Sequence, residues 1–138
     1  MQMMFQNPLA EISPRITLET FLLELYINYG FMNIAAVKDD ICKWIQGVDL
    51  PENTIYKYPH EVSGGQLQRV IIARIMLMNL KLVLFDEPTS AIDAVSQKLV
   101  IDLLQQLHME QSLGYVFVSQ DIGLLQAVTD WIIVMNDG

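Results

Sequence analysis

The sequence predicts an α/β protein in which a helical segment precedes part of a parallel β-sheet. Residues 16–50 have the apolar spacing of helices, whereas residues 81–138 alternate short apolar runs with helical patterns. An order of strand, helix, strand, helix, strand predicts parallel strands joined by right-handed crossover helices. A hydrophobic fraction of 52% over 138 residues supplies enough apolar side chains for a sizeable core.

Three helices are expected before residue 80. Four side chains of the segment ITLETFLLELYINYG are predicted to share one helical face: Ile16, Thr20, Leu23 and Ile27. Gly30 follows that segment as a stop signal, and MNIAAVKDDICKWIQG repeats the pattern as far as Gly47. The third helix is predicted over residues 66–79, and its apolar residues on nearly every side indicate that it is buried.

Three strands and two helices are expected after residue 80. The segments KLVLFDE and YVFVSQD are short, continuous apolar runs, as in strands that are buried within a parallel sheet. The segment WIIVMNDG is the predicted third strand, in which Trp131 is expected to pack. Helices are predicted between these strands, over AVSQKLVIDLLQQLHMEQ and IGLLQAVTD.

Net charge, cysteine content and hydrophobic run length indicate which partners and which cellular compartment are expected. The net charge of −8 argues against a nucleic-acid surface, which is normally basic. The single cysteine, Cys42, excludes an intrachain disulfide and fits a cytosolic setting. The sequence contains no run of 18 apolar residues, so it is not expected to span a membrane.

Two adjacent carboxylates follow the predicted strand in LVLFDEP. Ligands of parallel sheets bind at the carboxyl ends of the strands, which is where Asp86 and Glu87 are expected. Phosphoryl transfer needs an oxygen ligand for Mg²⁺ and a group that orients the attacking water, and adjacent carboxylates can provide both. The alternative is a strand that simply ends in polar residues before Pro88.

A glycine pair in HEVSGGQLQR precedes the third predicted helix. Ser63 can cap that helix, and the glycines leave backbone N–H groups open to an anion such as phosphate. An ordinary helix start with a glycine turn is the alternative. The pair of segments SGGQLQR and DEPTSAID, about 20 residues apart, is more specific than either segment alone.

In order and spacing, these segments resemble the motifs of ABC transporter nucleotide-binding subunits, and the resemblance covers the whole chain. VSGGQLQRV is similar to the signature motif, KLVLFDEP to the Walker B strand, TSAID to the D-loop and FQNP to the Q-loop, and VSQD stands at the H-loop position. FQNPLAEISPRIT and YPHEVSGGQ resemble a narrower group, the ATPases of bacterial peptide and nickel importers. Asn7 and Ser13 depart from that group's pattern.

The resemblance implies ATP and Mg²⁺ as ligands and a role for each motif residue. Asp86 would support Mg²⁺, Glu87 would polarise the attacking water, and Gln6 would contact the Mg²⁺ region and sense the membrane partner. Asp93 would lie at the interface with a second nucleotide-binding subunit, identical or different. Four signature residues would contact the γ-phosphate of an ATP held by that second subunit: Ser63, Gly64, Gly65 and Gln66.

The resemblance also implies a division of the chain within a P-loop NTPase fold. Residues 1–7 would form the strand that leads into the Q-loop, and residues 8–80 would form a helical subdomain that docks transmembrane permease subunits. Residues 81–138 would form the core part with Walker B, D-loop and H-loop position. The protein is therefore expected as a peripheral subunit on the cytoplasmic face of the cell membrane, where it couples ATP hydrolysis to import, with no nucleic acid as partner.

Two features depart from the family pattern. None of the seven glycines is followed by lysine, so the phosphate-binding loop G-x-x-x-x-G-K-[ST] is absent from this sequence. The chain is therefore expected to be a fragment of a longer ATPase and inactive in isolation. Gln120 stands where the family has a histidine near the γ-phosphate, and a glutamine can donate a hydrogen bond but cannot relay a proton.

Two other functions stay open. A non-catalytic regulatory or interaction module derived from an ABC ATPase would account for both departures. A DNA-repair or chromosome-maintenance ATPase head also has a signature motif, but such proteins insert long coiled coils before it. Only the 56 residues 7–62 separate Gln6 from Ser63 here, without sustained heptads, which argues against an ATPase head of that kind.

Overall fold

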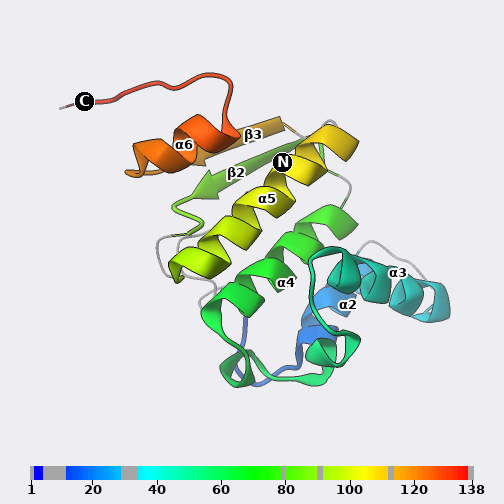
Figure 1. The fold of residues 1–138 in the computed structure, drawn as a ribbon. Coiled ribbons are helices and arrows are strands. Elements are labelled where there is room, and N and C mark those ends of the chain that lie inside the picture. The colour runs from blue at the N-terminus through cyan, green and yellow to red at the C-terminus, as the bar shows by residue number, and fades with distance from the viewer. Residues whose placement is uncertain are drawn as a thin grey trace.

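Three parallel strands form one sheet in the order β1-β2-β3 (Figure 1). The computed structural model describes residues 2–4, 12–28, 34–78, 80–89, 92–111 and 114–136. The strands are β1 (Gln2–Met4), β2 (Leu82–Asp86) and β3 (Gly114–Val118). Val83 pairs with Gln2 on one side and with Tyr115 on the other, so β2 is the central strand. The parallel α/β arrangement expected from the sequence is confirmed.

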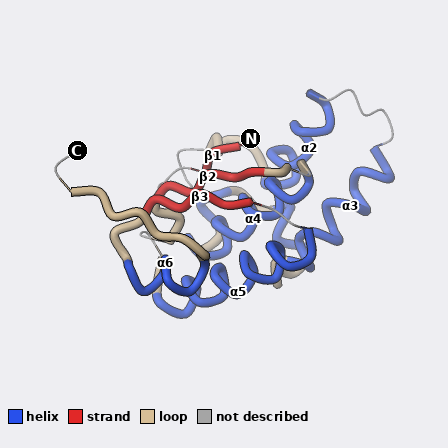
Figure 2. The backbone as a smooth tube through the Cα atoms, turned by 90° about the horizontal axis from the view of Figure 1, so that it is seen from above, coloured by secondary structure: helices blue, strands red, loops and turns tan. Residues whose placement is uncertain are grey.

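Helices account for most of the remaining described residues. They are α2 (Leu18–Asn28), α3 (Ile34–Gly47), α4 (Gly64–Leu77), α5 (Ala94–Gln111) and α6 (Ile122–Val128). Two short 3₁₀ helices, Glu52–Tyr56 and Pro59–Glu61, lie between α3 and α4. Helices α4 and α5 lie on the same side of the sheet, whereas α2 and α3 lie beyond α4 at one end (Figure 2). No helix of the described part is both long enough and apolar enough to cross a membrane.

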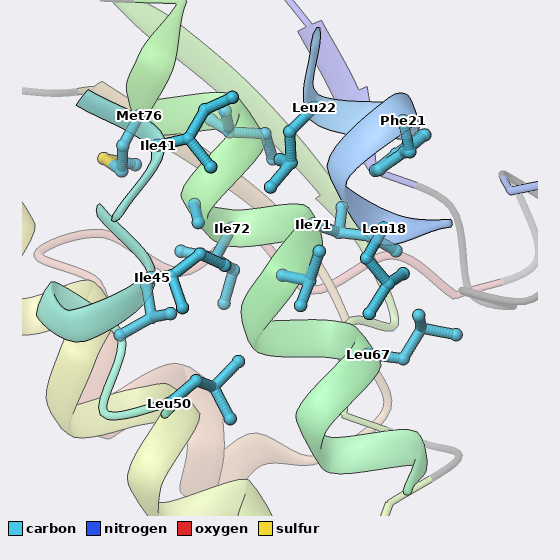
Figure 3. Close-up of a cluster of buried hydrophobic side chains, with 14 of the residues drawn as sticks. Leu18, Phe21, Leu22, Ile41, Ile45, Leu50, Leu67, Ile71, Ile72 and Met76 are labelled. Carbon is cyan, nitrogen blue, oxygen red and sulfur yellow. The ribbon is translucent and has the colours of Figure 1, made fainter. Parts of the chain in front are cut away.

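Helix α4 forms the centre of the hydrophobic core, which confirms that the third predicted helix is buried. Its apolar side chains meet those of α2 and α3 on one side, and the chain between residues 48 and 50 closes the cluster (Figure 3). The contributing side chains include Leu18 and Leu22 of α2, Ile41 and Ile45 of α3, and Leu67, Ile71, Ile72 and Met76 of α4. Helix α4 begins within residues 63–66, which we call the signature segment. The packing of α4 therefore fixes the position of this segment.

The buried face of α2 differs from the predicted one. Thr20 is exposed and Ile27 is 72% exposed, so the face expected to include both is wrong. The buried residues are instead Leu18, Phe21, Leu22 and Leu25, which follow the i, i+3, i+4, i+7 spacing. The segment carries apolar residues on several sides, so packing against α4 decides which of them are buried.

The described helices cover one face of the sheet. Val83 and Phe85 of β2 point into the core beneath α4 and α5 and are fully buried. On β3, by contrast, Val116 is 47% and Val118 is 52% exposed. The prediction that this second strand is buried is therefore wrong for Val116 and Val118.

The predicted third strand at the C-terminal end is also wrong over residues 131–136. This segment has no regular secondary structure, and Trp131, which was expected to pack, is 90% exposed. An apolar run becomes a strand only when a neighbouring strand pairs with it in register. The sheet still has three strands because the short segment near the N-terminus, β1, supplies the one beside β2.

Candidate functional site

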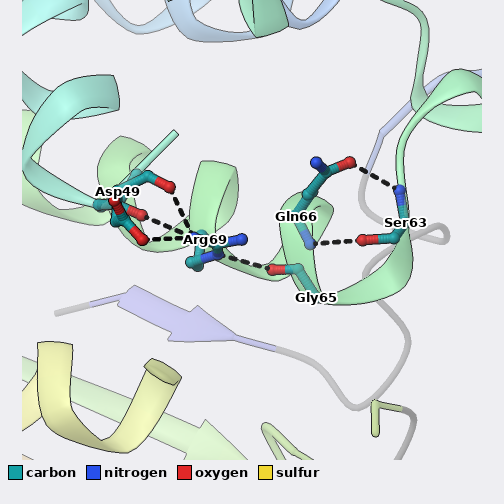
Figure 4. A network of polar contacts seen from close by, with 6 residues as sticks. Asp49, Ser63, Gly65, Gln66 and Arg69 are labelled. Atoms are coloured by element: carbon teal, nitrogen blue, oxygen red, sulfur yellow. Dashed lines mark hydrogen bonds and ion pairs between the residues drawn. The ribbon is translucent and has the colours of Figure 1, made fainter. Parts of the chain in front are cut away.

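The signature segment caps helix α4 with a reciprocal pair of hydrogen bonds (Figure 4). The Gln66 backbone N–H donates to Ser63 Oγ at 3.2 Å, and the Ser63 backbone N–H donates to Gln66 Oε1 at 3.0 Å. This capping box holds Ser63 at the exposed end of the helix. Helix geometry gives the N–H groups of Gly64 and Gly65 no intrahelical acceptor, so they can bind an anion at the helix N-terminus.

Arg69 anchors the first turn of α4 to the chain that follows α3 (Figure 4). Its Nη1 donates to the Asp49 backbone oxygen at 2.7 Å, and its Nε donates to the Gly65 backbone oxygen at 3.4 Å. A further ion pair of 3.7 Å joins Nη1 to Asp49 Oδ2. The Arg69 side chain is largely buried, so these bonds hold the signature segment rigidly on the helical part of the chain.

Gly65 permits a close approach between the signature helix and α5. A Cβ atom on Gly65 would lie 2.5 Å from both the Cβ and the Oγ of Ser96. Real Cβ atoms essentially never approach other atoms so closely, and one of the two atoms met is Ser96 Cβ, which rotation of the serine side chain cannot move away. Glycine at this position is therefore a packing requirement, and Gly65 itself is buried.

Asp93 fixes Ser96 from the amino end of α5. Asp93 Oδ1 accepts the backbone N–H groups of Val95 at 3.1 Å and Ser96 at 3.0 Å, and Oδ2 accepts the Ser96 hydroxyl at 2.7 Å. The Ser96 backbone N–H, together with its hydroxyl, lowers the pKa of the Asp93 carboxyl below its usual range. Asp93 and Gly65, predicted as separate site residues, therefore meet through Ser96. Sequence reasoning missed Ser96, although its spacing from Asp93 is that of a cap.

Replacing Gly65 with alanine is expected to lower the free energy of unfolding by about 1–3 kcal/mol, because the new methyl group overlaps Ser96. Denaturant unfolding of the 138-residue chain measures this change. Gly47→Ala is the matched control, since a Cβ there meets only Trp44 Cε3 at 3.9 Å. In a Ser96→Gly background the cost of Gly65→Ala should shrink. Equal costs in both backgrounds would show that the overlap is not the cause.

Glu87 lies at the carboxyl end of the central strand in an unusual backbone conformation. Asp86 is the last residue of β2, and Glu87 follows it with φ of 45°. This left-handed region is costly for a residue with a side chain, on the order of 1–3 kcal/mol, and such residues cluster at functional sites. The Glu87 backbone N–H donates to the Val118 backbone oxygen at 2.8 Å, which holds the turn against β3.

The side chains of Glu87 and Gln120 meet, although they are 33 positions apart in the sequence. Gln120 Nε2 donates to Glu87 Oε1 at 3.0 Å. Gln120 is exposed and Glu87 is half-buried, so the pair faces open space at the end of the sheet. The structure therefore brings the two predicted catalytic residues into direct contact.

Asp86 provides an oxygen ligand that suits Mg²⁺. Among the described residues no group of three or more His, Cys, Asp or Glu side chains is arranged to hold a metal ion. Mg²⁺ does not need such a cage, because it usually binds one or two carboxylates and takes its other ligands from water and substrate phosphates. The half-buried carboxylate of Asp86 fits that mode of binding. Gln6, the other predicted Mg²⁺ contact, lies outside the described residues.

Comparison with known proteins gives matches along the chain. Residues 1–90 match the ABC transporter family. The chain is 39% identical to the oligopeptide transport ATP-binding protein OppF of Salmonella typhimurium over 138 residues, which cover 99% of this chain and 41% of the relative. It is 36% identical to the oligopeptide transport ATP-binding protein AppF of Bacillus subtilis, over 99% of this chain and 42% of the relative. The chain thus spans about two fifths of the length of these relatives.

A solved structure supports the fold. The dimeric, post-hydrolysis structure of an ATP-binding cassette bound to ADP and Pi has a TM-score of 0.76 and 30% sequence identity to this chain. The match covers 91% of this chain and 54% of the cassette. The sheet, α4 and the helical part are therefore arranged as in a nucleotide-binding cassette.

Proposed function

Because the chain belongs to the ABC transporter family, we propose that it supplies part of the ATP-hydrolysing subunit of a bacterial peptide importer. One observation carries the proposal. Glu87 lies at the end of the central strand, in a left-handed conformation, with its carboxylate held by Gln120 at 3.0 Å. The names of the relatives favour peptides over nickel as cargo, since OppF and AppF are oligopeptide transport proteins.

The proposed roles of the site residues follow from their positions at the carboxyl end of β2. The Glu87 carboxylate accepts a proton or hydrogen bond from the attacking water, and Gln120 orients that carboxylate by donating to Oε1. Asp86 would hold Mg²⁺, which supplies positive charge that offsets the charge of the phosphates when it is bound. Gln6 is proposed to contact the same region from the Q-loop.

The signature residues are proposed to act on the nucleotide of a second subunit. The N–H groups of Gly64 and Gly65, with the side chains of Ser63 and Gln66, would contact its γ-phosphate, and Asp93 would lie at the interface. The cassette with which this chain shares its fold is dimeric, which supports a two-subunit site. The helical part, residues 8–80, is proposed to dock the permease, which would place the protein at the cytoplasmic face of the membrane.

The function is tested by peptide uptake. Membrane vesicles that contain the importer, with this subunit as its gene encodes it, should accumulate labelled peptide when loaded with MgATP but not with a non-hydrolysable analogue. A parallel assay with Ni²⁺ tests the other cargo class. ATP-independent peptide uptake would contradict the proposal. A non-catalytic module, favoured by Gln120 at the H-loop position, would instead leave uptake unchanged in a Glu87→Gln variant.

Replacing Gln120 with histidine is expected to speed ATP turnover by at least about tenfold, which is roughly 1.4 kcal/mol of barrier. A histidine at this position can still donate to Glu87 and, when protonated, donates more strongly to the charge that develops on the phosphoryl oxygens. Steady-state phosphate release by the assembled importer measures the change, and nucleotide affinity should stay the same. Equal rates for wild type and Gln120→His would show that the neutral amide already suffices or that the partner subunit's site carries the turnover. Removing the catalytic glutamate of each subunit in turn separates these two explanations.

A further inference from the structure

A buried glutamine in α4 bonds directly to the chain beside Glu87. Gln68 is 1% exposed, and its Nε2 donates to the backbone oxygen of Pro88. Pro88 is buried too and has no N–H group, so this carbonyl oxygen is its only backbone group able to form a hydrogen bond. A buried amide without a partner is costly, so the bond fixes the distance between α4 and the strand end.

Glu87 is consequently held from both sides of its strained position. On its amino side, its backbone N–H donates to the Val118 oxygen of β3 at 2.8 Å. On its carboxyl side, the next residue is bound by Gln68 of α4. A residue with φ of 45° keeps this conformation only when its surroundings enforce it. Gln68 belongs to that enforcing structure, although it is 20 residues from Pro88 in sequence.

Gln68 also lies on the same rigid helix as the signature segment. It follows the capping residue Ser63 by five positions, which is about 7.5 Å along the helix axis. Because α4 is buried along its length, a displacement at its N-terminus is transmitted to Gln68 as a movement of the whole helix. The hydrogen bond to Pro88 then carries that movement to Glu87.

We propose that Gln68 is a positioning residue. Through its bond to Pro88 it fixes the position of the Glu87 carboxylate, and through α4 it links Glu87 to the signature segment of the same subunit. The inference rests on the proposed ATPase function. In that function the signature segment contacts the nucleotide of the second subunit, whereas Glu87 acts at the nucleotide beside Asp86. Gln68 therefore connects the two ATP sites of the assembled pair.

The first test replaces Gln68 with methionine, which has similar length and volume but no donor. We expect kcat for ATP hydrolysis by the assembled importer to fall on the order of tenfold to a hundredfold, because Glu87 loses its alignment. KM for MgATP should stay within about twofold, since Gln68 touches no nucleotide in this account. The matched control is Gln105→Met. Gln105 Nε2 also donates from a helix to a distant backbone oxygen, that of Ala127, but it lies on α5 and its bond involves neither Glu87 nor Pro88.

The second test uses Gln68→Glu, because the new carboxyl group can only accept a hydrogen bond at high pH but can donate one once it is protonated at low pH. An ionised carboxylate cannot donate to the Pro88 oxygen, whereas a protonated carboxyl can, and burial raises the pKa of such a group. The kcat of Gln68→Glu relative to wild type should therefore recover as the pH is lowered, while that of Gln68→Met stays constant. A purely structural role would give no such difference.

The outcomes separate this inference from the proposed function. A wild-type importer without MgATP hydrolysis would overturn the proposed function. Normal wild-type turnover with an unchanged kcat in Gln68→Met would overturn the role of Gln68 alone. If Gln68→Met fails to fold, the pH profile of Gln68→Glu is the deciding measurement. A ratio of its kcat to the wild-type kcat that does not change with pH would count against Gln68 as a positioning residue.

Discussion

Replacing Phe85 with alanine is expected to lower the free energy of unfolding by about 3–5 kcal/mol. Phe85 lies on the central strand and is the largest of the fully buried side chains in the described part of the chain. Its ring stacks on Phe117 with centroids 4.7 Å apart and meets the edge of Tyr115 at 5.7 Å. Alanine would leave a cavity between the sheet and the helices, and would remove both aromatic contacts.

Denaturant unfolding of the 138-residue chain measures the effect of Phe85→Ala. Val116→Ala is the control on the neighbouring strand, because Val116 is 47% exposed and its truncation creates no enclosed cavity. We expect the control to change stability by well under about 1 kcal/mol. A similarly small loss for Phe85→Ala would contradict the description of Phe85 as a fully buried side chain of the core beneath the site.

Replacing Glu87 with glutamine is expected to lower ATP turnover by about 10²–10⁴-fold, the usual contribution of a general base. Glutamine has the same shape and still offers an oxygen to Gln120 Nε2, so the contact at 3.0 Å can persist while the negative charge is lost. The loss would therefore reflect the chemistry of the carboxylate and not a disturbed fold. Steady-state phosphate release by the assembled importer measures the rate, and MgATP affinity should be unchanged.

Glu52→Gln is the matched control for Glu87→Gln. Glu52 Oε1 also accepts a glutamine amide, from Gln46 Nε2 at 2.7 Å, but at an exposed position of a 3₁₀ helix in the helical part. Its variant should hydrolyse ATP at the wild-type rate. Turnover by Glu87→Gln within about tenfold of wild type would rule out Glu87 as the main base.

Local sequence signals predicted the elements that depend on local structure. Ser63 was predicted to cap the third helix, and in the structure its side chain caps α4, within a capping box that includes Gln66. The apolar run before Asp86 predicted the central strand, and the helical spacing after Asp93 predicted α5. In each case, the hydrogen-bonding partners lie within a few residues or the apolar pattern is unambiguous.

The failed predictions concern features set by distant parts of the chain. The apolar segment at residues 131–136 reads as a strand, yet strand formation depends on a partner in register, which no pattern within the segment specifies. The buried face of α2 is determined by its packing against α4, a segment about 40 residues further along the chain. The contact between Gln120 and Glu87 follows from the register of β3 on β2, in which Val118 opposes Asp86. The bond from Gln68 to Pro88 likewise joins residues that only the folded chain brings together.

The proposed site is tested most directly by a structure of the Glu87→Gln subunit, as its gene encodes it, bound to MgATP. We expect Mg²⁺ at the Asp86 carboxylate, with Gln120 beside the γ-phosphate. We also expect the N–H groups of Gly64 and Gly65 to contact the γ-phosphate of the nucleotide held by the opposite subunit. A nucleotide bound away from Asp86, with the glycine amides of both subunits facing only solvent, would contradict the proposed site.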